Sequence, residues 1–157
     1  MAAAATLLEI SGAAAQNTFQ TGNWTGQAQF EGNRFSHCQI GVSFTDGKRL
    51  NLQLTPQLAL TVSAMKSDWN MDHEKVYNVT FEIDGGFRKS YRGVVKADRR
   101  NTVSFTIGND GPLRQALATG GNMTWVDSSG TRFGFSLMNG ANAMRKLLAC
   151  TALYGAD

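Results

Sequence analysis

The C-terminal stretch of the chain, residues 131–154, changes its hydrophobic period halfway along. Its first apolar residues alternate with polar or small ones, as in a half-buried β-strand: Phe133, Phe135 and Leu137. From Asn139 onward the spacing becomes three to four, which puts one apolar row on a helical face: Ala143, Leu147, Cys150 and Tyr154. Asn139 is the expected N-cap of this helix. The stretch therefore predicts a strand that turns sharply into a closing helix packed on a sheet.

The rest of the chain carries the same period-2 alternation between short turn sequences. We expect strands at 23–31, 36–44, 50–54, 58–62, 77–83, 87–97, 103–107, 123–125 and 133–137. Asp-Gly and Ser-Gly turns separate several of them, and Pro112 begins a short helix over 113–119. The 17 glycines against two prolines fit a chain with many turns. We predict a mainly β, single-domain antiparallel sandwich or barrel-like sheet, with the short helix and the C-terminal helix packed on it.

The N-terminal segment differs in composition from everything that follows. Residues 1–17 are Ala-rich and contain the run Ala13-Ala14-Ala15, which resembles a signal-peptidase site, yet they lack a basic n-region. Two interpretations stay open for this segment, a trimmed leader and a flexible or partly helical arm. Residues 18–157 are expected to form the single β-rich domain. No apolar run reaches the roughly 18 residues of a membrane span, so we expect no transmembrane segment.

Two cysteines lie far apart, Cys38 in an early strand and Cys150 in the last helix. No CxxC spacing occurs, which excludes zinc fingers and thioredoxin-like redox chemistry. Two alternatives remain for the pair. One is a single disulfide, which requires an oxidising compartment, and the other is two buried free thiols in a cytosolic protein.

The sequence offers little for catalysis. The only histidines are His37 and His73, and His37 points to the opposite side of its strand from Cys38, so the two do not form a nucleophile pair. No GxSxG, HExxH, P-loop or GxGxxG motif occurs. We therefore predict no enzyme, no catalytic residue, no cofactor and no metal. A metal-dependent enzyme is kept as an alternative on one loop cluster: Asp68, Asp72, His73 and Glu74.

Two stretches are candidates for binding a partner. The polar loop 65–75 carries apolar anchors beside charged residues, which is the pattern of an inhibitor or immunity-type protein: Trp69, Met71, Asp72 and His73. The strand 87–97 is basic on one face: Arg88, Arg92 and Lys96. That face is either solvated, as a guard against edge pairing, or in contact with a polyanion. A net charge of only +3 argues against nucleic acid.

Three short motifs resemble a bacterial family: Phe81-Glu82-Ile83-Asp84-Gly85, Leu113-Arg114-Gln115-Ala116-Leu117, and FSLMNGA from Phe135 to Ala141 with Ala143. They are similar to the invasion-associated locus B family and related small exported domains of α-proteobacteria. Those proteins share a strand that ends in Ile-Asp-Gly and a terminal strand-to-helix junction, often followed by a cysteine. Locus B proteins usually carry more central cysteines, whereas this chain has none between Cys38 and Cys150. The resemblance is therefore closer to the family's uncharacterised relatives.

The resemblance implies an exported β-rich domain with one structural disulfide, Cys38–Cys150, and no catalytic residues to carry over. Together with the missing catalytic motifs, it predicts a non-enzymatic bacterial binding module in the periplasm or outside the cell. Its expected partner is a protein or a cell-envelope component.

Overall fold

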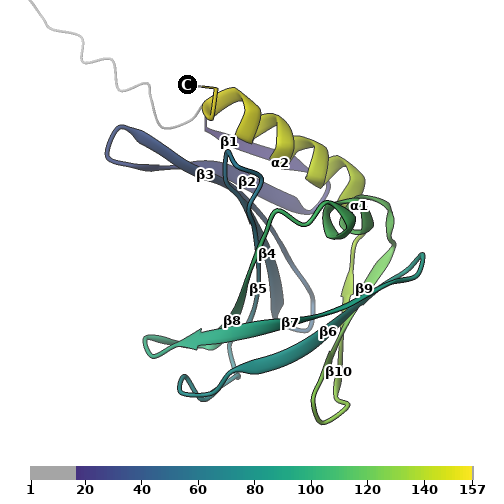
Figure 1. The fold of residues 1–157 in the computed structure, drawn as a ribbon. Coiled ribbons are helices and arrows are strands. Elements are labelled where there is room, and N and C mark those ends of the chain that lie inside the picture. Colours follow the sequence, from purple (N-terminus) through teal and green to yellow (C-terminus); the bar gives the residue numbers. More distant parts are fainter. Residues whose placement is uncertain (1–16, 157) are drawn as a thin grey trace, which may run out of the picture.

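The computed structural model describes residues 17–156 and contains ten strands and two helices (Figure 1). The elements are β1 (Thr18–Thr21), β2 (Trp24–Glu31), β3 (Arg34–Ser43), β4 (Lys48–Leu54), β5 (Leu60–Lys66), β6 (Tyr77–Ile83), β7 (Phe87–Lys96), β8 (Arg99–Gly108), α1 (Gly111–Thr119), β9 (Asn122–Asp127), β10 (Arg132–Ser136) and α2 (Gly140–Tyr154). The mainly β fold class with a short and a C-terminal helix is confirmed. The expectation for the N-terminal segment concerns residues outside the described ones, apart from Asn17.

All ten strands belong to one antiparallel sheet in the order β1-β2-β3-β4-β5-β8-β7-β6-β9-β10. The first five form a meander of hairpins, as the Asp46-Gly47 turn between β3 and β4 predicts. β7 is the hinge of the sheet, because its first part pairs with β6 and its pairing with β8 shifts register between Val94 and Lys96. In Figure 1 the sheet bends there, so that β4 and β5 stand upright and β6 and β7 run across beneath them. The result is barrel-like.

Strand alternation places one face of this bent sheet in the core. β3, β4 and β5 contribute aliphatic rows, which α2 covers with its own buried side chains: Ile40, Val42, Leu50, Leu52, Leu54, Leu60, Val62, Ala143, Met144 and Leu147. Below them lies an aromatic cluster: Phe81, Phe105, Trp125 and Phe135. A Cβ on Gly93 would lie 2.6 Å from the Phe105 ring, so glycine at this position of β7 admits that ring.

Cys38 of β3 and Cys150 of α2 form a disulfide in the structure, with their Cα atoms 6.2 Å apart. The bond fixes the closing helix to the sheet and is the pairing that the family resemblance implies. Neither described helix is both long and apolar enough to cross a membrane.

One strand was missed, and two local expectations are wrong. β1 was not expected, because four residues are too short to show a period. Leu58 lies outside β5, since its backbone has a φ of 60° in the 55–59 turn. Asn139 does not cap α2 with its side chain; it adopts the left-handed conformation, with a φ of 62°, while its carbonyl accepts from Ala143 N–H. The strand-to-helix turn is too tight for an extended N-cap.

α1 begins at a charged cluster that the sequence pattern gave no reason to expect. Asp110 caps the helix, because its Oδ1 accepts from the Leu113 N–H at 3.0 Å. Its other oxygen accepts from Lys89 Nζ and Tyr91 Oη of β7, both at 2.8 Å. Burial acts to raise the pKa of Asp110, but these hydrogen bonds and the Lys89 charge outweigh it and hold the pKa below its usual value. The cluster ties α1 to the sheet hinge.

Asp110→Asn is expected to lower the free energy of unfolding by about 2 kcal/mol at pH 7, because the acceptor for Leu113 stays while the ion pair with Lys89 is lost. A depressed pKa in the folded state stabilises above the ordinary Asp pKa of about 4, and this stabilisation is lost as the pH falls through the folded value. The deficit of the variant should therefore shrink at pH 3. Urea unfolding at both pH values measures it, with the exposed Asp98→Asn as control. An equal deficit at both pH values would contradict the ionic role.

Candidate functional site

The loop between β5 and β6 is held firmly against the sheet. Met71 N–H donates to the carbonyl of Arg100 at 2.8 Å, and Arg100 Nε donates back to the Met71 carbonyl at 2.9 Å. Asp72 N–H donates to Tyr77 Oη at 2.8 Å. These three hydrogen bonds fix the middle of the loop to β8 and to the start of β6.

Beneath this loop lies a cavity of about 330 Å³, which we call the Trp69 pocket. Its walls come from the loop and from β6, β8, β9 and β10: Asp68, Trp69, Asn70, Met71, Tyr77, Val79, Val103, Trp125, Asp127 and Phe133. Cavities of this size accept a small ligand or a single large side chain of a partner. The prediction that Trp69 and Met71 anchor the loop agrees with their packing against the core.

Four of the residues that line the pocket are aromatic: Trp69, Tyr77, Trp125 and Phe133. Trp69 meets Phe133 edge to face, with ring centroids 5.7 Å apart. Trp125 stacks on Phe81 at 4.8 Å with its ring nearly parallel, at 4°. Rings held in this way present both apolar surface and an electron-rich face to whatever enters.

Trp69 differs from the other two tryptophans in its indole N–H. Trp24 Nε1 donates to the carbonyl of Met138 at 2.8 Å, and Trp125 Nε1 donates to Met123 Sδ at 3.4 Å. Within residues 17–156 the Trp69 indole N–H donates to no protein group. Trp69 is also only half-buried, so this residue of the pocket wall keeps a hydrogen-bond donor that the described residues do not use.

The charged residues that line the pocket are both acidic. Asp127 Oδ1 accepts from Ser129 Oγ at 2.6 Å and from the Ser129 and Thr131 N–H groups at 2.9 Å. The Ser129 hydroxyl bond is the main cause that holds the pKa of Asp127 below its usual value, so the carboxylate is ionised at neutral pH. Asp68 is 68% exposed, and its Oδ2 forms an exposed ion pair with Lys66 Nζ at 3.3 Å. Aromatic faces with two carboxylates favour a cation on an apolar stem.

The remaining members of the loop cluster face elsewhere. Asp72 pairs with Lys75 at 3.8 Å and accepts from the Glu74 N–H at 2.9 Å, and His73 is exposed outside the pocket. Among residues 17–156 no group of three or more His, Cys, Asp or Glu side chains is placed to hold a metal ion. The metal-dependent alternative therefore has no site within the described residues.

The basic face of β7 lies apart from the Trp69 pocket. Arg88, Arg92 and Lys96 are all exposed on one side of the strand, as their spacing predicts. Glu82 forms ion pairs with Arg88 at 3.3 Å and with Arg132 at 2.7 Å. Part of this basic face is therefore neutralised across β6 and β10.

Most of the residues that line the Trp69 pocket were not predicted as site residues from the sequence. Tyr77, Trp125 and Phe133 lie on strands whose alternation assigns them simply to the core. Their convergence depends on pairing, since Trp125 lies opposite both Phe81 and Phe133 in the register of β9 with its two neighbours. Clustered aromatics close to strand ends, beside a loop that carries its own tryptophan, were the available signal.

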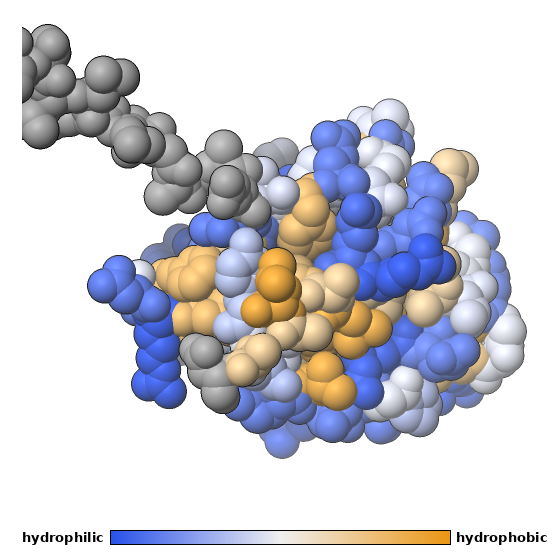
Figure 2. Space-filling view, turned by 90° about the horizontal axis from the view of Figure 1, so that it is seen from above, coloured by the Kyte–Doolittle hydropathy of each residue, from blue (hydrophilic) through white to orange (hydrophobic). Residues whose placement is uncertain are grey.

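A second surface feature lies on the side that carries the helices. Figure 2 shows apolar residues gathered on this side of the molecule. The exposed apolar side chains in and just before α2 include Met138, at 71%, and Leu153, at 70%. Neither belongs to the Trp69 pocket.

Comparison with known proteins gives a structural relationship. No family model matches the chain, and no curated protein matches its sequence. Among solved structures, the chain is similar to the crystal structure of invasion associated protein B from Bartonella henselae, with a TM-score of 0.62 and 12% sequence identity. The match covers 84% of this chain and 95% of that one. This chain and the Bartonella protein therefore share a fold, as the resemblance of the sequence motifs implied. At 12% identity the comparison shows the fold and nothing more.

Proposed function

We propose that this chain is a non-enzymatic, exported bacterial protein that binds a partner protein by taking one of its Lys or Arg side chains into the Trp69 pocket. The observation that carries the proposal is the combination of aromatic rings and two carboxylates among the residues that line the pocket. The aliphatic stem of the guest side chain lies against the rings, and its charge lies near Asp68 or Asp127.

Export is supported by the disulfide and by the resemblance to exported domains. A bond between Cys38 and Cys150 persists in an oxidising compartment such as the periplasm or the exterior of the cell. The structural neighbour is described as invasion associated, which is in line with a non-enzymatic bacterial protein. Trp69 is half-buried against Phe133 and does not project from the loop. This favours a loop that receives a side chain of a partner over an inhibitor that inserts Trp69 into its target.

Short peptides of defined charge test the pocket. The ¹⁵N-labelled protein is titrated with acetyl-Gly-Arg-Gly-amide, acetyl-Gly-Lys-Gly-amide and acetyl-Gly-norleucine-Gly-amide, and the Trp69 Nε1–H resonance is followed by NMR. We expect the two cationic peptides to shift this resonance and to bind about tenfold more tightly than the norleucine peptide. Trp69→Ala lacks this reporter and is followed instead through the backbone amide resonances of the pocket residues; it should not bind the peptides. Asp68→Asn should weaken binding.

The control is His73→Ala, a change in the same loop but outside the pocket, which should leave the affinity unchanged. Equal binding of the norleucine peptide would overturn the cationic assignment. An unshifted Trp69 resonance with all three peptides would overturn the pocket as the binding site.

A further inference from the structure

The sheet face opposite the core carries rows of uncharged polar side chains. One row crosses five strands at matching register: Gln27 of β2, Gln39 of β3, Gln53 of β4, Thr61 of β5 and Thr106 of β8. A parallel row contains Asn51 of β4, Ser63 of β5 and Ser104 of β8. Solvent-facing antiparallel strands are commonly polar, but they usually mix in charges of both signs.

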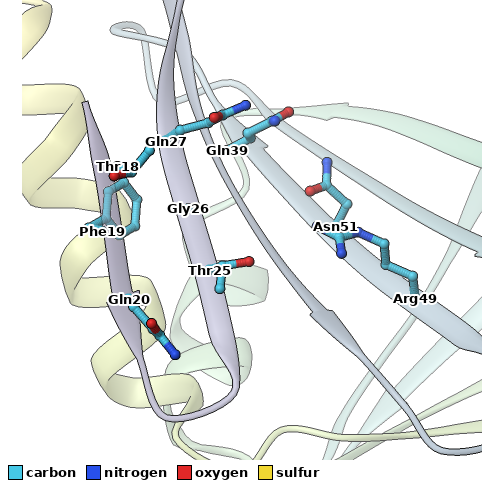
Figure 3. Close-up of a pocket in the computed structure, with 9 residues that line it drawn as sticks. All are labelled: Thr18, Phe19, Gln20, Thr25, Gly26, Gln27, Gln39, Arg49 and Asn51. Carbon is cyan, nitrogen blue, oxygen red and sulfur yellow. The ribbon is translucent and has the colours of Figure 1, made fainter. Parts of the chain in front are cut away.

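This face is hollowed rather than flat. Two grooves of about 430 and 490 Å³ share Gln39, Arg49 and Asn51, so they form one continuous channel across the sheet. Figure 3 shows Gln27, Gln39, Asn51 and Arg49 extending from neighbouring strands, while Phe19 lies on the side of the helix. We call this surface the polar channel.

The amides of the polar channel are unused by the protein itself. Gln27, Gln39, Asn51 and Gln53 are each half-buried, yet none of their side chains hydrogen-bonds another residue in the range 17–156. The other arm of the sheet behaves differently, since Thr80 and Ser90 bond each other at 2.7 Å across β6 and β7. Each amide offers both donors and an acceptor, which suits hydroxyl groups that also donate and accept.

Arg49 supplies a charge at the centre of the polar channel. A Cβ on Gly41 would lie 2.8 Å from its Nη2, so the guanidinium lies over the bare backbone of β3. Arg49 Nη1 donates to Ser43 Oγ at 3.3 Å, and among the described residues no carboxylate pairs with it. Neither groove has an acidic lining residue, whereas Lys96 and Arg99 line the second. Lys96 is one of the basic residues that the sequence marks for partner contact.

We propose that the polar channel binds an acidic oligosaccharide. Its hydroxyls pair with the free amides and hydroxyls of the two rows, and a carboxylate of the sugar pairs with Arg49. Single-stranded nucleic acid is disfavoured, because Phe19 is the only aromatic among the lining residues and lies on the helix side, so bases have no ring on which to stack.

Isothermal titration with tetragalacturonate, maltotetraose and dT8 tests the assignment on the intact protein. We expect tetragalacturonate to bind and maltotetraose of equal length to bind at least about tenfold more weakly, because it has no carboxylate for Arg49. Arg49→Gln should weaken tetragalacturonate binding by about tenfold. Gly41→Ala should also weaken it, because the new methyl group displaces the guanidinium while the charge is kept.

Arg145→Gln removes an exposed cation of α2 and is the matched control, for which we expect no change. Trp69→Ala should also leave sugar binding intact, so failure of the Trp69 pocket and failure of the polar channel are separable. Three results would overturn the proposal: no binding of tetragalacturonate, equal loss with Arg145→Gln and Arg49→Gln, or tighter binding of dT8. Thermal unfolding of each variant confirms that it is folded.

Discussion

Removing the disulfide with the double substitution Cys38→Ser and Cys150→Ser is expected to lower the free energy of unfolding by about 4–5 kcal/mol. The bond joins β3 to α2 across 112 positions of sequence, so it closes most of the chain into one loop and restricts the unfolded state strongly. Such a loss is a large share of the roughly 5–15 kcal/mol by which domains are stable.

Urea unfolding of the wild-type protein and the double variant, each with and without reductant, measures this effect. Reductant should bring the wild-type midpoint to that of the variant and leave the variant unchanged. A wild-type midpoint that does not move under complete reduction would contradict the expected contribution. Alkylation of the unfolded protein before and after reduction checks that both cysteines are bonded in the material under test.

The sheet was largely predictable because each strand carries its own local signal. Alternation marks the buried rows of β3, β4, β6 and β8, and Asp-Gly turns mark the hairpins. The closing helix was predictable from the change of period at Asn139. The strand order beyond β5 was not, because the insertion of β8 between β5 and β7 is a choice among pairings that no local pattern distinguishes.

The candidate sites were predictable only where they lie on one segment. Trp69 and Met71 stand out inside a polar loop, but Tyr77, Trp125 and Phe133 join them only through the register of three strands. The polar channel depends still more on pairing, since its glutamines are unremarkable until Gln27, Gln39 and Gln53 line up. The prediction that the Asn139 side chain caps α2 failed because the tight turn holds this residue in a left-handed backbone conformation, which overrides its preference for the N-cap.

Phe81→Ala is expected to lower the free energy of unfolding by about 3–5 kcal/mol. Phe81 is fully buried on β6, and its ring centroid lies 4.8 Å from Trp125, 4.9 Å from Tyr91 and 5.0 Å from Phe105. It therefore connects the two arms of the bent sheet, and its removal leaves a cavity that four strands cannot close without moving. Urea unfolding at neutral pH measures the loss, and near-UV circular dichroism reports the lost stacking on Trp125.

Phe81→Leu and Phe30→Ala separate the causes of this loss. Leucine fills most of the space, so its cost should be about 1–2 kcal/mol, and the difference from alanine gives the contribution of the cavity. Phe30 is 38% exposed, and its ring contacts those of Phe35 and Tyr154, so its truncation should cost less than that of the fully buried Phe81. If Phe81→Ala cost no more than Phe30→Ala, the aromatic cluster would not join the two arms. The Trp69 pocket, whose Trp125 wall rests on Phe81, would then need another support.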